Sequence, residues 1–255
     1  MKRVLLLVLA AGLVGAASPP SSAARAAAFY DEIAKQRTDL GFTGGTFSGP
    51  GADVLAKAVE NTQYVMIGED HGIAEIPAFS TALCRENMTG DQKSNLDRTQ
   101  LHRYHFVGAD RAAFADTGKH PKVLVKMGGY HLFEGISMLG DRELGNFLAE
   151  YAALQGQRTL NILVLGAKGE QLAFAGMGHP YAPVPLDLLH DKRADFAFLA
   201  PFFKNLGSAP VLYDLRELRR PFARSGLQSV NLSHVIDGYD LLVVVPRPHA
   251  SHQVS

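Results

Sequence analysis

The sequence contains no tryptophan and only one cysteine, Cys84, among its 255 residues. An intramolecular disulfide, a cysteine-based zinc cage and any binding mode anchored on tryptophan are therefore excluded. Net charge is also absent, because 25 basic residues balance 25 acidic ones, so neither nucleic acid nor an anionic membrane is an expected partner. Hydrophobic residues make up 47% of the chain, which fits a globular protein rather than a disordered, collagen-like or coiled-coil one.

The first residues form a charged and then apolar pattern that is typical of export. Lys2 and Arg3 precede an apolar run over residues 4–17 that ends in small side chains. This run is shorter than the roughly 20 residues that a membrane span needs, so it predicts a secretory signal peptide rather than an anchor. Cleavage could follow Ala17 or Ala24. We assign residues 1–24 to the leader and residues 25–255 to one domain, which is expected to be periplasmic or secreted.

Short apolar runs alternate with helical patterns along the rest of the chain. Runs that suit strands buried on both faces lie at 64–67, 122–126, 160–165, 210–213 and 241–245. Helical spacing is found at 26–37, 52–60, 76–86 and 144–155. This alternation predicts a three-layer α/β fold with a mostly parallel sheet flanked by helices. The glycine-rich segment 41–51 is interpreted as a loop, and so is the polar segment 87–98.

The residues that follow the predicted strands are the best candidates for chemistry, because ligands of α/β sheets bind at the carboxyl ends of the strands. After the strand at 64–67 come Gly68, Glu69, Asp70, His71 and Gly72. A carboxylate beside an imidazole orients it and raises its basicity, as general base catalysis requires. The alternative is a turn whose polar residues only cap the following helix.

The strand at 122–126 is followed by a second glycine and histidine segment, which contains Gly128, Gly129 and His131. If the two strands are neighbours, His71 and His131 could face one crevice, one as base and the other as acid or electrophile. Together with Glu69 they could also hold a divalent metal, since two histidines and one carboxylate form a known ligand set. A structural role for each histidine is the alternative.

Other polar residues give weaker signals. Asp214 ends a predicted strand but is followed by arginines that could pair with it, and His249 is expected in a frayed C-terminal tail. The remaining weak candidates are His102, His105, His179, Arg247 and His252. No P-loop, GxGxxG, GxSxG or HExxH motif is present, which disfavours a nucleotide-binding enzyme and a serine hydrolase.

The segments YVMIGEDHG (64–72) and KVLVKMGGYHL (122–132) resemble the two histidine motifs of the erythromycin esterase-like and ChaN-like superfamily, which includes TIKI and TraB-type proteins. LGNFLAEYAALQG (144–156) and LLVVVPR (241–247) resemble the later helix and last strand of its exported members. The resemblance implies a three-layer fold in which Glu69 and His71 match the first acid and base, and His131 the second histidine. It implies metal-free ester or lactone hydrolysis in the esterases, a divalent metal in the TIKI group and haem binding in ChaN-like members.

The chain departs from this family in one region. Members have another buried strand soon after the first helix, ending in a carboxylate, whereas no apolar run follows Cys84 here. The chain is therefore interpreted as internally shortened, with the carboxylate absent or supplied by Glu86, Asp97 or Glu134. Removal of an inner strand predicts poor stability or a homodimer.

Several functional hypotheses follow. The first is an exported hydrolase without a cofactor that acts on a small-molecule ester or lactone, with His71 as base, Glu69 as orienting carboxylate and His131 as donor. The alternatives are a binding protein for haem or another small ligand, a hydrolase with a divalent metal on the same three residues, and an inactive, shortened remnant of the fold.

Overall fold

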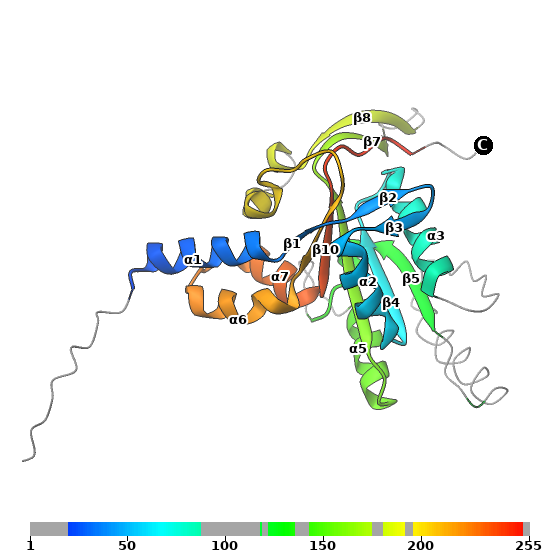
Figure 1. Ribbon diagram of the computed structural model, residues 1–255, viewed down its shortest axis with the longest axis horizontal. Coiled ribbons are helices and arrows are strands. Elements are labelled where there is room, and N and C mark those ends of the chain that lie inside the picture. The colour runs from blue at the N-terminus through cyan, green and yellow to red at the C-terminus, as the bar shows by residue number, and fades with distance from the viewer. Residues whose placement is uncertain are drawn as a thin grey trace, which may run out of the picture.

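The structure is a computed structural model that describes residues 20–87, 118, 122–135, 143–174, 181–191 and 196–251. A six-stranded sheet forms its centre, with helices packed on both faces (Figure 1). In spatial order the strands are β1 (Arg37–Asp39), β9 (Val211–Asp214), β10 (Leu241–Val245), β6 (Thr159–Gly166), β4 (Tyr64–Glu69) and β5 (Val123–Gly128). Neighbours from β10 to β5 are parallel, while β9 runs antiparallel to both β1 and β10. The predicted α/β class with a mostly parallel sheet is confirmed.

The two faces of the sheet are covered by different helices. Because side chains alternate along a strand, Val65 and Ile67 of β4 face α2 (Pro50–Glu60) and α3 (Glu75–Asn87), while Met66 lies on the opposite face. The helices of that opposite face are α1 (Ser22–Lys35), α5 (Leu144–Leu154), α6 (Arg216–Ser225) and α7 (Val230–Gly238). The strands are buried on both sides, which explains why their sequences are continuous apolar runs.

Two hairpins and three short 3-10 helices complete the described part of the chain. The hairpins are β2 (Gly41–Thr43) with β3 (Thr46–Ser48), and β7 (Lys168–Phe174) with β8 (Tyr181–Asp187). The 3-10 helices are η1 (Gly129–His131), η2 (Leu188–His190) and η3 (Ala197–Phe203). The prediction of a loop over 41–51 is therefore wrong, because Gly44 and Gly45 form a tight turn at positive φ and α2 already begins at Pro50.

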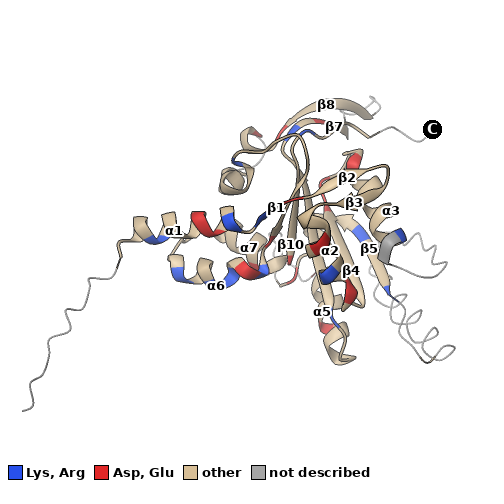
Figure 2. Cartoon of the chain, viewed as in Figure 1, with Lys and Arg blue, Asp and Glu red and all other residues tan. Residues whose placement is uncertain are grey.

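The N-terminal end of α1 lies inside the segment that was assigned to the leader. Ser21 caps this helix, and its hydroxyl accepts a hydrogen bond from the Ala24 amide at 3.2 Å. No helix within the described ranges is long and apolar enough to span a bilayer. Basic and acidic residues are interspersed along α1 and α6, whereas the sheet is mainly uncharged (Figure 2).

Candidate functional site

The candidate site lies where the chain leaves β4 and β5 in opposite directions. These strands are neighbours in register, with Glu69 beside Gly128. After β4 the chain passes to α3 on one face of the sheet, and after β5 it passes through η1 to α5 on the other face. Such a divergence opens a crevice at the carboxyl ends of two adjacent strands, which is where α/β proteins bind ligands.

Glu69 is the carboxylate around which the first half of the site is built. Its side chain is only 9% exposed, and its Oε1 lies 3.2 Å from Nδ1 of His71. Its Oε2 lies 2.7 Å from Nζ of Lys126, which projects from β5. The carboxylate selects the His71 tautomer that carries its proton on Nδ1, so Nε2 is the basic nitrogen. The lysine keeps Glu69 from rotating away from the ring.

Gly128 brings the second histidine against the first. A Cβ atom built on Gly128 would lie 2.9 Å from Nε2 of His71 and 3.6 Å from Cδ2 of His131, so both rings pack against this backbone. His131 has a carboxylate of its own, since its Nδ1 lies 3.3 Å from Oε2 of Glu143 at the start of α5. Two imidazole–carboxylate pairs therefore stand side by side at the ends of β4 and β5.

The turn that carries His71 is held by two segments from elsewhere in the chain. Gly72 has φ +84°, and its carbonyl oxygen accepts 2.8 Å hydrogen bonds from the Leu172 and Ser251 amides. A Cβ on Gly72 would lie 2.1 Å from the Leu172 oxygen, so no larger residue fits. Next to it, Ile73 pairs with Ala250 of the C-terminal segment. The position of His71 thus depends on both β7 and the end of the chain.

Tyrosines support the second turn. The Tyr239 hydroxyl donates a hydrogen bond to the Gly129 carbonyl oxygen. Gly68 has no side chain, and this leaves room for the Tyr239 ring to approach Gly129. Burial raises the pKa of the Tyr239 hydroxyl above its ordinary value. Tyr130 lies beside His131, and burial together with the negative charge of Asp70 raises its pKa. Both hydroxyls therefore keep their protons at neutral pH and can act as donors.

A pocket of about 720 Å³ opens between these two turns, the β7–β8 hairpin and α7. Both histidines line it, together with Glu69 and Tyr130. Its remaining wall is mainly apolar and includes Phe133, Leu163, Leu186, Phe196, Leu199 and Val235. Such a cavity has the size and character of a small-molecule site.

The three residues suggested as ligands of a divalent metal do not form a group of converging donors in the described part of the chain. A metal on Glu69, His71 and His131 would need all three donors to converge, and the described residues contain no such group of three. In addition, Lys126 already lies 2.7 Å from Glu69, and an ammonium group at that distance would repel a divalent cation.

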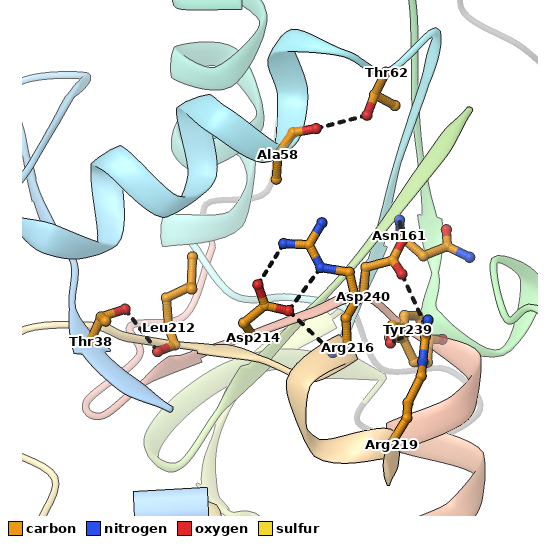
Figure 3. Close-up of polar contacts among 10 residues, drawn as sticks. All are labelled: Thr38, Ala58, Thr62, Asn161, Leu212, Asp214, Arg216, Arg219, Tyr239 and Asp240. Atoms are coloured by element: carbon orange, nitrogen blue, oxygen red, sulfur yellow. Dashed lines mark hydrogen bonds and ion pairs between the residues drawn. The ribbon is translucent and has the colours of Figure 1, made fainter. Parts of the chain in front are cut away.

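Two weaker candidates, Asp214 and Glu134, lie away from the site for reasons of topology. Asp214 ends β9 and pairs with Arg216, as its neighbouring arginines allowed (Figure 3). Because β9 runs antiparallel to β10, Asp214 lies beside Leu241 at the amino edge of the sheet rather than at the carboxyl edge. Glu134 is not a substitute for the missing carboxylate either. It accepts a 3.0 Å hydrogen bond from Thr159, at the amino end of β6.

The expectation of a frayed tail is wrong for His249. Its Nδ1 lies 2.6 Å from Oε1 of Glu75, its carbonyl accepts a hydrogen bond from Ala74, and the carboxylate raises its pKa. Arg247 is exposed. The other candidates, His102, His105, His179, His252 and Asp97, together with the side chain of Glu86, lie outside the described residues.

Lys126, Tyr130 and Glu143 are among the residues of the site that were missed from the sequence. Lys126 had a signal, because it is a charge inside an otherwise apolar run one strand away from Glu69. Tyr130 adjoins a candidate histidine and could have been included on that ground. Glu143 had no signal, since it lies twelve residues from His131 and meets it only through the packing of α5.

Comparisons with known proteins do not assign the chain to a family. No family model matches it, and no curated protein matches it. A solved structure of a Bacillus cereus protein aligns with 15% identity and a TM-score of 0.38, over 69% of this chain. This chain spans 44% of the length of that protein. The esterase-like resemblance thus rests on the sequence motifs.

Proposed function

We propose that the protein is an exported hydrolase that cleaves an ester or lactone with water activated by His71. One observation carries the proposal. His71 is held by Glu69 through Nδ1, and its ring packs beside His131 at the mouth of a largely apolar pocket. A base with an orienting carboxylate and a neighbouring donor is the arrangement that hydrolysis by water requires.

In the first step, Nε2 of His71 takes a proton from water as the water oxygen bonds to the acyl carbon. The Glu69 carboxylate compensates the positive charge that forms on the ring, and Lys126 holds that carboxylate in place. The carbonyl oxygen becomes an oxyanion. The Tyr130 hydroxyl, which stays protonated, is the group proposed to donate to it.

In the second step, the tetrahedral intermediate collapses and the carbon–oxygen bond of the ester breaks. Protonated His131, oriented by Glu143, gives its Nε2 proton to the departing alkoxide, which leaves as the alcohol. The acyl group leaves as the acid. His71 returns its proton to solvent and His131 regains one, so the cycle consumes one water per ester bond.

The same contacts support a reaction without a metal. Glu69 serves as the hydrogen-bond partner of His71 and the ion-pair partner of Lys126, which leaves it poorly suited to ligate a cation. We therefore expect turnover to survive treatment with a chelator. Loss of turnover on chelation, and its return with added zinc or manganese, would contradict this part of the proposal.

The function is tested by hydrolysis of activated esters of increasing acyl length and of macrolide lactones. His71→Ala is expected to lose at least about a hundredfold in kcat, the typical contribution of a general base. His190→Ala is the matched control, because His190 pairs with Asp187 at 2.8 Å on the surface and does not line this pocket. Equal turnover in His71→Ala and the wild-type protein would refute the assignment.

A second candidate is a binding protein for haem, favoured by the combination of two histidines and an apolar wall in one pocket. His71 or His131 would be the axial ligand. A Soret shift on haem addition that disappears in His131→Ala would support this candidate. Absence of both turnover and haem binding, together with a broad thermal transition, would instead indicate an inactive remnant.

We also propose that export cleavage follows Ala17 rather than Ala24. Cleavage after Ala24 would remove the Ser21 cap and the first residues of α1, as well as the Pro20 carbonyl to which Arg25 donates at 2.6 Å. Loss of an N-cap costs about 1 kcal/mol. The mass of the mature protein, recovered from an exporting host, distinguishes the two sites, and a start at Arg25 would contradict the proposal.

A further inference from the structure

Residues 246–251, which we call the C-terminal strap, leave β10 and run between β7 and the turn that carries His71 (Figure 1). On the β7 side, the carbonyl oxygens of its two prolines accept hydrogen bonds from β7 amides at 3.2 and 2.9 Å. On the other side, the strap meets residues 72–75, which join the turn to α3. The strap therefore lies against the chain that positions the proposed base.

The strap and the turn form one rung of antiparallel β structure, in which Ile73 pairs with Ala250. The amide that follows each of these residues donates to the carbonyl oxygen that precedes the other, at 2.9 Å from Ala74 and at 2.8 Å from Ser251. A two-stranded β structure without further packing is marginal in water, so a single rung holds the two segments only weakly. Such a short pairing needs a further contact to keep its register.

Glu75 and His249 supply that contact. Glu75 begins α3, and its carboxylate accepts both a backbone and a side-chain hydrogen bond from one residue of the strap. The amide nitrogen of His249 lies 3.1 Å from Oε2, and its ring Nδ1 lies 2.6 Å from Oε1. A carboxylate with both partners binds the strap by its main chain as well as by its imidazole, through charge-assisted contacts. The Glu75–His249 pair therefore closes the rung at its α3 end.

The proposed base lies between one end of the turn that the main sheet holds and one end that the strap holds. Before His71, the Asp70 amide donates to a carbonyl oxygen of β6 at 3.3 Å. After His71, the carbonyl oxygen of Gly72 is held by Leu172 of β7 and by the strap. The His71 side chain is 62% exposed, so little packing holds its ring. A shift of the strap would therefore move the ring away from the carboxylate that orients it.

We propose that Glu75 and His249 are positioning residues for His71, because their pair fastens the strap to the turn and so fixes the imidazole. This proposal rests on the proposed hydrolase function and adds two residues that orient its base. Neither Glu75 nor His249 lines the pocket of the site, so both act through His71 rather than on the ester. Because Gly72 keeps its bond to Leu172 when the strap loosens, the expected effect on the rate is partial.

The protonation of His249 makes the pair depend on pH. The hydrogen bond and the negative charge of Glu75 raise the pKa of His249 above 6.5, and the charge of Glu170 on β7 adds to this. The other titratable or charged residues that line the hollow beside the strap, within the described part of the chain, are Lys168, Asp187, His190 and Arg247. Since the pKa is raised in the fold, the contribution of protonated His249 is present below 6.5 and is lost as the pH rises through the raised pKa.

The proposal is tested with Glu75→Gln and His249→Gln, each of which removes the charged contact while keeping a polar side chain. Three quantities are measured: the exchange rates of the Ala74 and Ser251 amides, the His71 tautomer by ¹⁵N NMR, and kcat on an activated ester. We expect both amides to exchange faster and His71 to populate both tautomers. We expect kcat to fall about threefold to tenfold, a part of the roughly hundredfold loss that a displacement of about 1 Å can cause.

His190→Gln is the matched control, because His190 is 79% exposed and pairs with Asp187 at 2.8 Å, much as His249 is 78% exposed and pairs with Glu75. It should leave all three quantities unchanged. The double variant Glu75→Gln/His249→Gln should lose no more than either single variant, since each change breaks the same pair. The ratio of wild-type kcat to Glu75→Gln kcat should be largest near pH 6.5 and should fall as His249 loses its proton, which a merely structural role would not produce.

The outcomes separate this proposal from the proposed function. If the wild-type protein turns over no ester, the hydrolase function fails, but a changed His71 tautomer in both variants still supports the positioning role. Amide exchange and a tautomer that match the His190→Gln control would overturn the proposal. Faster amide exchange with an unchanged tautomer and kcat would also overturn it, because the strap then does not position the ring. A double variant whose loss is the product of the two single losses would show independent roles and overturn the pairing.

Discussion

Gly128→Ala tests the site through a single added methyl group. Gly128 has φ −55° and ψ 140°, a conformation that alanine adopts freely, so the backbone is not strained by the change. The new Cβ would lie 2.9 Å from Nε2 and 3.3 Å from Cε1 of His71, closer than ordinary van der Waals contact. The imidazole must therefore move by about 0.5 Å or rotate.

That movement should impair catalysis more than folding. The His71 side chain is 62% exposed, so it can turn toward solvent at little cost in packing, but its Nδ1 then leaves the 3.2 Å contact with Glu69. Misplacement of a reacting group by about 1 Å can cost about a hundredfold in rate. We expect kcat to fall about tenfold to a hundredfold, while the free energy of unfolding changes by less than about 1 kcal/mol.

The assay combines ester hydrolysis with urea unfolding, and ¹⁵N NMR of the imidazole reports the His71 tautomer even if turnover is low. Gly207→Ala is the control, because its added Cβ would have no neighbour within 4 Å. It should keep wild-type turnover. If Gly128→Ala also keeps wild-type turnover and tautomer, the position of the His71 ring does not govern the reaction and the reasoning fails.

Three further changes test the surroundings of the site. Lys126→Met should lower kcat about tenfold, because Glu69 loses its charge-assisted partner, and unchanged kinetics would refute that role. Glu134→Gln should lose less stability than the wild-type protein as the pH rises above 4.5. Burial and the charge of Asp240 raise the pKa of Glu134 in the folded protein, so Glu134 stabilises the fold at low pH and this contribution is lost as the carboxyl ionises. If the urea midpoints of the wild-type protein and Glu134→Gln change equally with pH, the prediction is wrong. Gly72→Ala should lower the free energy of unfolding more than Gly45→Ala. Both glycines have positive φ, which costs alanine about 1–2 kcal/mol, but only at Gly72 would the new Cβ collide with a neighbouring atom, the Leu172 oxygen.

The sequence predicted those strands whose burial dictates their composition. β10 matches its predicted range of 241–245 because five consecutive apolar residues are buried on both faces. The β7–β8 hairpin was missed because it lies outside the main sheet, and β8 alternates exposed and partly buried residues with prolines at 183 and 185. The β2–β3 hairpin was missed because its glycines were interpreted as a loop, although Phe42 and Phe47 flank the turn and pack against each other.

The two histidines and Glu69 could be found from the sequence because each follows a strand within a few residues. The contacts of Lys126 with Glu69 and of Glu143 with His131 could not, because these contacts depend on chain direction and register. The side of the sheet that Lys126 faces follows from its pairing with Ile67, and a slip of β5 by one residue would turn the lysine to the opposite face, away from Glu69. Asp214 illustrates the same limit, since nothing local shows that β9 is antiparallel. The chemical groups of this site are therefore encoded locally, whereas the contacts that orient them arise only when the sheet is assembled.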